Sequence, residues 1–247
     1  MIIIANWKAY VEDFEKAKKL FAISKKLSRA TTITIVLAPP APLLGALAHN
    51  NKSKVSFSAQ DVSVTLGGAK TGEVIAPVYA TTGASYAIIG HSERRAAGDT
   101  NTIVAEKIVH ALACKLTPIL CVGEHERDRE GVYLNFIREE ITSALILLPE
   151  KDRSKIIVAY EPLWAIGKSA ESAIGPHDLN EMVLYIHKVL AELLPGKKSM
   201  TTPILYGGSV EPGNIRDLAR TSDVDGFLIG HASVDPLSFT ALVKQLS

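Results

Sequence analysis

The feature that most constrains the fold of this chain is a series of short apolar runs, each followed by a segment with helical periodicity. The runs lie at residues 2–4, 33–37, 55–57, 86–89, 118–122, 156–159, 203–205 and 226–229. Between the first two runs, apolar residues share one helical face, namely Phe14, Ala17, Leu20, Phe21 and Leu27. Alternating strands and helices predict a parallel sheet, and eight such units in 247 residues predict a closed (β/α)8 barrel of the α/β class.

Composition favours one domain and argues against several classes of protein. No Ser/Gly-rich linker or charge block divides the chain, so we expect a single domain over residues 1–247. A net charge of +1 gives no overall field for nucleic acid or an anionic membrane, and no apolar run approaches the ~18 residues of a membrane span. Residues 1–5 lack the features of a signal peptide, and Cys114 and Cys121 suggest neither a disulfide framework nor a metal site. We therefore expect a cytoplasmic protein.

Polar residues gather where the predicted strands end. In (β/α)8 barrels the chemistry lies at the carboxyl ends of the strands, so this position selects the candidate residues. The segments concerned are 6–8, 90–93, 121–124, 161, 206–209 and 230–233. Lys8, His91 and Glu161 can move protons or stabilise charge, whereas the glycine-rich turns offer bare backbone N–H groups. We expect both kinds of group at one mouth of the barrel.

Glu161 follows an apolar, β-branched run that is typical of a fully buried strand. Burying its carboxylate unpaired would cost several kcal/mol, so we expect it at the mouth of the barrel, aimed by Pro162. Trp164, Ile166 and Gly167 come next, and a loop of these residues could shield a small site from water. The alternative is a structural glutamate paired with a neighbouring cation, beside a tryptophan that belongs to the core.

Glycine turns follow the last two predicted strands, at Gly208-Ser209 and at Gly230-His231. Turns of this kind that lead into a helix form binding sites for anions. Either one alone is more simply a tight turn, but two that follow adjacent strands favour a phosphate site. Because neither matches Gly-x-Gly-x-x-Gly between a strand and a helix, no dinucleotide cofactor is expected.

His91, Glu161 and Lys8 together suit one class of reaction. His91 precedes a possible helical turn, where the positive potential favours a neutral imidazole that can donate its N–H to a carbonyl oxygen. With Glu161 as base and Lys8 as a fixed cation, the set fits proton abstraction next to a carbonyl and stabilisation of an enediolate. A single histidine at such a position more often only forms hydrogen bonds within a turn, and a single lysine is more often solvated. No Ser–His–Asp order, metal motif or second carboxylate for glycoside hydrolysis is present, so no metal is expected.

Taken in order, these motifs resemble the triosephosphate isomerase family nearly from end to end. The matching segments are 6–8, 60–61, 71–73, 89–95, 121–124, 159–167, 206–210 and 226–230. The resemblance implies a TIM barrel that interconverts dihydroxyacetone phosphate and D-glyceraldehyde 3-phosphate, in glycolysis and gluconeogenesis, with no cofactor or metal. A glutamate base beside a neutral histidine is a known feature of the family. The resemblance also implies a homodimer or larger oligomer, in which loop 67–73 reaches into the partner and Thr71 meets the partner's Asn6.

The resemblance implies a role for each residue of the site. Glu161 would shuttle the proton, His91 would polarise the carbonyl, Lys8 and Asn6 would stabilise negative charge, and Glu93 would lie behind Lys8. The backbone N–H groups that bind phosphate would be those of Gly167, Ser209, Gly230 and His231. The lid would run from Pro162 to about Ser172 with Trp164 bonded to Glu124, and Ile166 and Leu228 would clamp the Glu161 carboxylate. Cys121 would be a packing residue and not a nucleophile.

The chain departs from the family pattern in the lid and in the last turn. Residues 168–172 replace the usual Thr-Gly and Lys-Thr-Ala, which leaves the lid kinetics open. His231 stands where a second glycine is usual; it would cost about 1 kcal/mol if the position requires positive φ, and it could make phosphate binding depend on pH. Asp99 replaces a glutamate that commonly pairs with Arg94, so altered dimer packing is expected.

Three other functions fit parts of the pattern. An isomerase of the same family could prefer a longer sugar phosphate, such as a tetrulose phosphate, because the catalytic set does not fix chain length. A phosphoribosyl isomerase would use paired aspartates after the first and fifth strands, which this sequence lacks. A phosphate-binding protein without catalysis would have no need of Lys8, His91 and Glu161 together.

Overall fold

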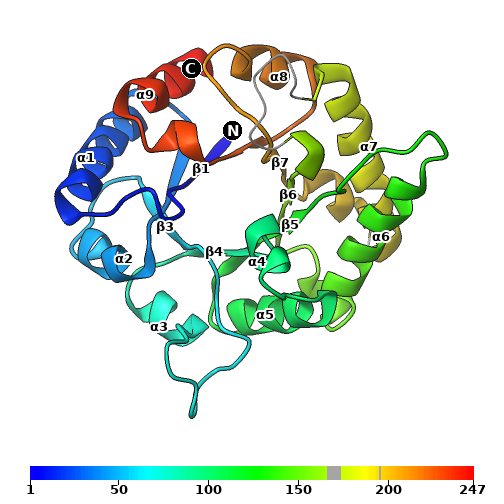
Figure 1. Ribbon diagram of the computed structural model, residues 1–247, viewed down its shortest axis with the longest axis horizontal. Coiled ribbons are helices and arrows are strands. Elements are labelled where there is room, and N and C mark those ends of the chain that lie inside the picture. The colour runs from blue at the N-terminus through cyan, green and yellow to red at the C-terminus, as the bar shows by residue number, and fades with distance from the viewer. Residues whose placement is uncertain (166–173, 195) are drawn as a thin grey trace.

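The computed structural model describes residues 1–165, 174–194 and 196–247. In this part of the chain, parallel strands form one closed barrel, in which consecutive strands pair and β1 also pairs with β8 (Figure 1). The strands are β1 (Ile2–Asn6), β2 (Thr34–Ala38), β3 (Ser56–Ala59), β4 (Tyr86–Ile89), β5 (Thr117–Val122), β6 (Ile157–Tyr160), β7 (Ile204–Tyr206) and β8 (Gly226–Ile229). The predicted single-domain (β/α)8 barrel is therefore confirmed.

Buried apolar side chains fill the interior of the barrel. They are Ile4, Val36, Ala38, Ile88, Ile119, Cys121, Ile157, Ala159, Leu205 and Leu228. Neighbouring strands approach so closely that a Cβ atom on Gly226 would lie 1.9 Å from the carbonyl oxygen of Ile2. Each large aliphatic side chain buried here contributes about 1.5–3 kcal/mol to folding. The barrel is thus a packed core, and only its ends are open to ligands.

Helices surround the barrel and cover its outer face (Figure 1). The α-helices are α1 (Phe14–Ala30), α2 (Ala41–Ala48), α3 (Ala76–Thr81), α4 (Ser92–Ala96), α5 (Asn101–Ala113), α6 (Val132–Leu145), α7 (Pro176–Leu193), α8 (Ile215–Thr221) and α9 (Pro236–Gln245). The 3-10 helices are η1 (Glu150–Asp152), η2 (Leu163–Ala165), η4 (Gly196–Thr201) and η5 (His231–Ser233). Helix α1 begins at Phe14 because the Asp13 side chain accepts a hydrogen bond from Lys16 N at 2.8 Å. None of the helices in the described ranges is long and apolar enough to cross a membrane.

The predicted strands match the observed ones closely, but details differ. The sixth strand was expected at 156–159, whereas β6 extends to Tyr160, which pairs with Tyr206 of β7. Phe14 was expected on the apolar face of the first helix, and this is wrong. Phe14 is 39% exposed at the first residue of α1, and its ring lies under the ammonium group of Lys18.

Candidate active site

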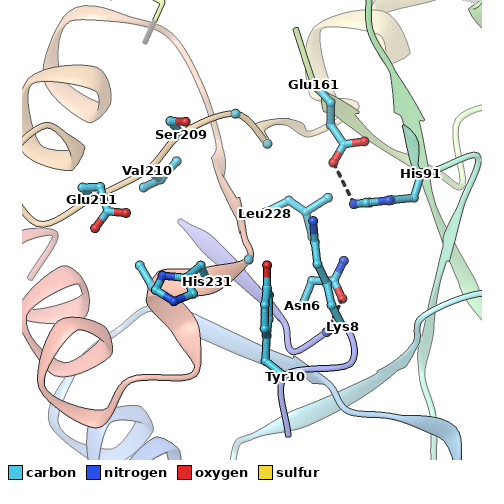
Figure 2. A pocket seen from close by; sticks show the side chains of 14 residues that line it. Asn6, Lys8, Tyr10, His91, Glu161, Ser209, Val210, Glu211, Leu228 and His231 are labelled. Carbon is cyan, nitrogen blue, oxygen red and sulfur yellow. Dashed lines mark hydrogen bonds and ion pairs between the residues drawn. The ribbon is translucent and has the colours of Figure 1, made fainter. Parts of the chain in front are cut away.

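A cavity of about 360 Å³ opens at the carboxyl ends of the strands (Figure 2). Its lining consists of Asn6, Lys8, Tyr10, His91, Glu161, Gly207, Gly208, Ser209, Val210, Glu211, Leu228, Gly230, His231 and Ala232. We distinguish two ends of this cavity. The Glu161 end comprises Asn6, Lys8, His91 and Glu161, and the glycine-turn end comprises Tyr10, residues 208–211 and residues 230–232. The predicted residues that follow β1, β4, β6, β7 and β8 thus lie around one space.

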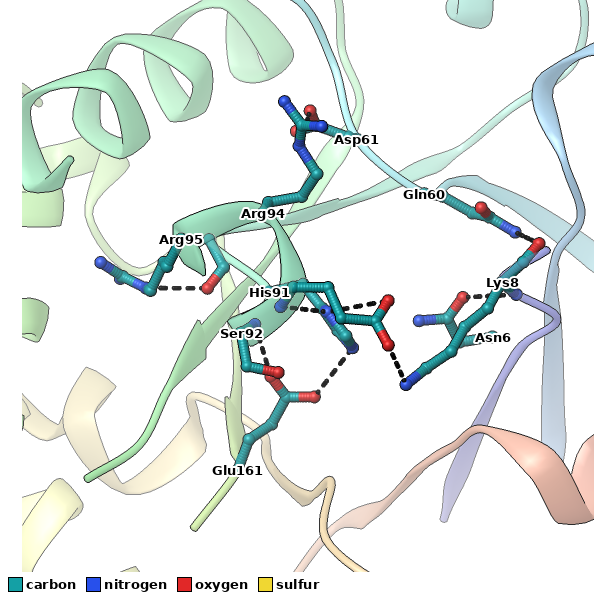
Figure 3. A network of polar contacts seen from close by, with 11 residues as sticks. Asn6, Lys8, Gln60, Asp61, His91, Ser92, Arg94, Arg95 and Glu161 are labelled. Carbon is teal, nitrogen blue, oxygen red and sulfur yellow. Dashed lines mark hydrogen bonds and ion pairs between the residues drawn. The ribbon is translucent and has the colours of Figure 1, made fainter. Parts of the chain in front are cut away.

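The carboxylate of Glu161 is almost fully buried, with 3% of the residue exposed. Its Oε1 lies 3.4 Å from Nε2 of His91, and its Oε2 accepts a hydrogen bond from Ser92 N at 3.4 Å (Figure 3). Glycines that directly follow the neighbouring strands β5 and β7 make room for Glu161. A Cβ atom on Gly123 would lie 1.8 Å from the Glu161 carbonyl oxygen, and one on Gly207 would lie 2.8 Å from Glu161 Cγ. Replacing either glycine would therefore displace this residue.

His91 is the N-cap residue of α4, and only 6% of it is exposed. Its Nδ1 accepts a hydrogen bond from Glu93 N at 3.2 Å. A ring nitrogen that accepts this bond cannot carry a proton, so in a neutral ring the proton lies on Nε2. Nε2 is the atom that faces Glu161, and an N–H donor is thereby presented to the cavity. The expected position at a helix N-terminus is confirmed.

Lys8 adopts a backbone conformation that is unusual for a residue other than glycine, with φ of 45°. Contacts on both sides of the residue stabilise this conformation: Lys8 N donates to Asn6 Oδ1 at 3.1 Å, and Gln60 Nε2 donates to Lys8 O at 2.9 Å (Figure 3). Such strain is typical of functional sites, where neighbouring contacts hold it in place. The result is that the side chain of Lys8 points into the cavity (Figure 2).

Glu93 lies beside Lys8, as the resemblance implied, and accepts a hydrogen bond from Lys8 Nζ at 2.8 Å. Partial burial of the Glu93 carboxyl opposes its ionisation, but the hydrogen bond and the charge of Lys8 outweigh burial. The pKa of Glu93 therefore lies below its ordinary value, and its carboxylate is ionised at neutral pH. With 63% of the Glu93 side chain exposed, solvent screens this pair, and it can part without a large cost.

A second group of buried polar residues supports the Glu161 end from behind. Glu140 of α6, 2% exposed, accepts a hydrogen bond from Gly123 N at 2.9 Å and lies 3.2 Å from Arg95 Nη1. Burial raises the pKa of Glu140 to about 7, against the attraction of Arg95. Cys121, which is also buried here, has a thiol pKa raised well above its ordinary value by burial and by the charge of Glu161. It stays protonated and packs in the barrel, in line with the expectation that it is no nucleophile.

The segment after Glu161 is described only in part. Trp164 Nε1 donates to Glu124 Oε1 at 2.8 Å, which is the contact that the resemblance implied. Leu163 N donates to the Glu124 carbonyl oxygen at 2.9 Å, so Glu124 holds the start of this segment through both backbone and side chain. Ile166, Gly167 and residues 168–172 lie outside the described residues.

The glycine-turn end presents backbone, as expected. Gly208 must be glycine because a Cβ atom there would lie 2.2 Å from the Tyr206 hydroxyl. The Ser209 hydroxyl donates to the Ala165 carbonyl at 2.8 Å, which joins this turn to the segment after β6. Gly230 precedes η5, and the first N–H groups of a helix have no partner within it. Both turns therefore bring backbone to the lining of one end of the cavity.

His231 lies in η5 and not in the left-handed region of φ. Among the described residues other than glycine, positive φ occurs at Lys8, Asn50 and Lys115. The backbone cost that was considered for a histidine at this position therefore does not arise.

Two residues of the glycine-turn end were not singled out from the sequence, namely Tyr10 and Glu211. The Tyr10 ring meets the His231 ring edge to face, with centroids 5.5 Å apart and planes at 80°. Each residue stands two positions beyond a predicted site residue, Lys8 or Ser209. That spacing at the mouth of the barrel is the signal that could have identified them.

The region expected at the dimer contact has two notable features. Residues 66–73, which include Thr71, are exposed, and Figure 1 shows the loop after β3 projecting beyond the ring of helices. Asp99 lies 3.7 Å from Arg94 Nη2, so a contact with Arg94 is kept. Its closer partner is Lys107 Nζ, at 2.6 Å, which is buried and also bonded to Asp61.

In the described part of the chain, no group of three or more His, Cys, Asp or Glu side chains could hold a metal ion. The polar groups of the cavity are instead arranged for hydrogen bonding and proton transfer, with a carboxylate, an imidazole N–H and an ammonium group around one space.

Comparison with known proteins gives a consistent result. A model of the triosephosphate isomerase family matches residues 1–246. The chain is 36% identical over 246 residues to the triosephosphate isomerase of Endomicrobium trichonymphae, across 98% of this chain and 97% of that protein. It is 38% identical over 248 residues to that of Moorella thermoacetica, across 98% and 97%. For that of Cytophaga hutchinsonii, identity is 36% over 249 residues, across 99% and 98%.

Proposed function

The chain belongs to the triosephosphate isomerase family, and on this premise we propose how the residues around its cavity carry out the reaction. Its activity is the interconversion of dihydroxyacetone phosphate and D-glyceraldehyde 3-phosphate, a step of glycolysis. The reaction moves one proton between neighbouring carbons and one between their oxygens. It therefore needs a base, a donor for the carbonyl oxygen and a means to stabilise an enediolate.

The substrate's phosphate binds at the glycine-turn end. Its oxygens accept hydrogen bonds from the backbone N–H groups of Ser209, Gly230 and His231, and Gly167 adds a further donor. Donors at the start of a helical turn suit a dianion because the helix dipole adds positive potential. Fixing the phosphate there places the carbonyl and its neighbouring carbon at the Glu161 end.

Glu161 takes a proton from the carbon next to the carbonyl and returns it to the former carbonyl carbon. To reach the substrate, its carboxylate gives up the hydrogen bond from Ser92 N, which is long at 3.4 Å. The Nε2–H of His91 donates to the carbonyl oxygen, and the Lys8 ammonium stabilises the negative charge that develops there. The Asn6 side chain accepts a hydrogen bond from Lys8 N and lines the space for the substrate.

Shielding from water completes the mechanism. Residues 162–172, including Pro162, Trp164 and Ile166, act as the lid. Leu228 and Ile166 form an apolar clamp on the Glu161 carboxylate. Excluding water keeps the enediolate from eliminating phosphate. Neither a metal nor an organic cofactor takes part.

The observation that carries this proposal is that Lys8, His91 and Glu161 line one cavity next to the glycine turns. The test is a coupled assay that follows conversion of each triose phosphate into the other by the purified chain. We expect turnover in both directions, and competition by inorganic sulfate. Absence of turnover in both directions would instead favour a phosphate-binding protein without catalysis.

Chain length of the substrate can be decided in the same assay. Comparing kcat/KM for three-carbon and four-carbon ketose phosphates should favour the three-carbon substrate. A higher value for the tetrulose phosphate would favour the rival function.

The proposal includes a cytoplasmic homodimer. Loop 67–73 of one protomer reaches into the second protomer, so that Thr71 approaches the partner's Asn6. The exposure of this loop supports the arrangement, since apolar Leu66 at its base is 46% exposed. Sedimentation equilibrium should give twice the chain mass, and Thr71→Arg should give monomers with lower activity. A monomer in the unaltered chain with full activity would contradict this part.

A further inference from the structure

The glycine-turn end carries side chains that the reaction does not use. Tyr10, Glu211 and His231 line the same cavity as the catalytic residues, and the Tyr10 and His231 rings meet edge to face (Figure 2). The two residues come from opposite ends of the chain, after β1 and β8, which pair in the closed barrel. An edge-to-face contact of this kind contributes about 0.5–1.5 kcal/mol and fixes the relative orientation of the rings.

Both rings stand on turns whose backbone is held by hydrogen bonds. Tyr10 N donates to the Trp7 carbonyl at 3.0 Å, and Lys16 Nζ donates to the Tyr10 carbonyl at 2.7 Å. In η5, Ser233 N and its hydroxyl both donate to the Gly230 carbonyl, at 2.9 and 2.7 Å. The backbone that carries the His231 ring is therefore fixed, and it belongs to the turn proposed to bind phosphate.

The charges around the cavity leave a phosphate dianion short of positive partners. Among the described residues that line it, Lys8 is the permanent cation, while Glu161 and Glu211 are carboxylates. Lys8 is moreover bonded to Glu93. A dianion that enters this space therefore meets more negative than positive charge, unless an imidazole is protonated. His91 Nδ1 already accepts a hydrogen bond from Glu93 N, and its Nε2 faces Glu161 Oε1 at 3.4 Å, so His231 is the other imidazole among the described residues of the lining.

Negative groups face His231 from more than one element. Glu211 comes from the connection between β7 and α8, and Asp235 is the N-cap of α9. The pKa of Asp235 lies below its ordinary value, chiefly because Ser238 N donates to it, with attraction to His231 as a lesser cause. Tyr10 and Lys8 face the same space from the connection after β1.

We propose that His231 is a further substrate-binding residue, whose protonated imidazole supplies positive charge at the phosphate end of the site. Tyr10 is the positioning residue for His231, since the edge-to-face contact of the two rings keeps the imidazole at the lining of the cavity. The inference rests on the proposed function, because it assumes that the phosphate binds at the glycine turns. Binding of a dianion is then coupled to uptake of a proton by His231.

The coupling has a defined sign. An imidazole changes charge between about pH 5 and pH 8, so affinity for a dianion rises as pH falls through this range. A single charge near a dianion at the mouth of a cavity, partly screened by salt, changes affinity about fivefold. Glu161, Lys8 and the backbone donors stay as they are in a His231→Gln variant, which keeps a polar side chain without the charge.

Inorganic sulfate is the suitable probe because it remains a dianion throughout this range, whereas a phosphate ester titrates near pH 6. Calorimetry of sulfate binding to the full-length protein should show affinity rising about fivefold more from pH 8 to pH 5.5 than in His231→Gln. At pH 7, titrations in buffers of different ionisation enthalpy should show proton uptake that the variant loses. Tyr10→Phe, which keeps the ring, should behave as the unaltered chain, whereas Tyr10→Ala should weaken the pH dependence.

Equal pH profiles and equal proton uptake in the unaltered chain and His231→Gln would overturn the inference. Circular dichroism and the melting temperature of the variant show whether it is folded, and Tyr10→Ala supplies a second test that leaves His231 in place. The outcome is independent of turnover. A protein without isomerase activity whose sulfate binding still takes up a proton through His231 would contradict the proposed function alone, and an active enzyme with no such coupling would contradict the inference alone.

Discussion

The two ends of the cavity differ in how firmly their side chains are held. At the Glu161 end, Glu161 and His91 are 3% and 6% exposed and contact one another or neighbouring backbone. At the glycine-turn end, Tyr10 is 45% exposed and His231 is exposed as well. The first end needs particular side chains in particular positions, whereas backbone N–H groups at the second can come from almost any residue. Properties peculiar to this chain should therefore arise at the glycine-turn end, and those common to the reaction at the Glu161 end.

Shortening the base should have the largest effect on the Glu161 end. In Glu161→Asp the carboxylate retreats by one methylene, so kcat should fall about 10³-fold with little change in KM, because proton transfer depends on reach while phosphate binding does not. Steady-state kinetics in both directions measure this. The matched change at the other end, His231→Gln, should alter KM and leave kcat within a few-fold. A kcat for Glu161→Asp near that of the unaltered chain would remove Glu161 from its proposed role.

One methyl group added to a glycine near each end tests whether the two ends differ in their tolerance of extra volume. In Gly207→Ala the new Cβ would lie 2.8 Å from Glu161 Cγ, so the carboxylate must move. A misplacement of about 1 Å lowers kcat about 10²-fold. In Gly230→Ala the new Cβ meets Lys8 Cε at 3.4 Å, a contact with the far end of a flexible side chain and not with the base.

Gly230→Ala should therefore lower kcat less than Gly207→Ala does, with its loss mainly in KM. Both variants are compared at equal folded fraction, judged by their melting curves. Equal losses of kcat in the two variants would mean that the ends of the cavity do not differ in tolerance.

The barrel and most of the cavity lining could be predicted from the sequence, because both follow from the position of a residue along a strand. The alternation of apolar runs with helical segments determines the barrel, and the end of each strand determines which residues reach its mouth. Contacts between side chains on connections that are distant in the sequence could not be predicted. Tyr10 and His231 meet only because β8 closes on β1, and nothing in either local sequence predicts the orientation of their rings.

Buried charge was equally hard to predict. Lys107 would be taken for a solvated helix residue, yet it is 3% exposed because Asp61 and Asp99 converge on its ammonium group. The placement of Glu161, with its carboxylate toward Ser92 N, likewise depends on the space left by Gly123 and Gly207, which follow β5 and β7.

A further expected effect concerns stability, and not turnover, at the buried support of the Glu161 end. Glu140 has a folded-state pKa of about 7, raised by burial above the ordinary value of 4.5. Between these values the folded chain binds more protons than the unfolded chain, so the free energy of unfolding falls as pH rises from 4.5 to 7 and levels off above. The contribution of this one group is about 3 kcal/mol.

Glu140→Gln removes this titration, so urea unfolding of the variant between pH 5.5 and pH 8, at fixed protein concentration, should lack that part of the decline. The matched variant Glu139→Gln alters an exposed carboxylate on the same helix and should keep the full decline, because water solvates that group in both states. Parallel pH profiles for the unaltered chain and Glu140→Gln would mean that Arg95 and Gly123 N keep Glu140 ionised throughout. The Glu161 end would then be supported by a permanent ion pair and would be no more sensitive to pH than the backbone donors of the glycine-turn end.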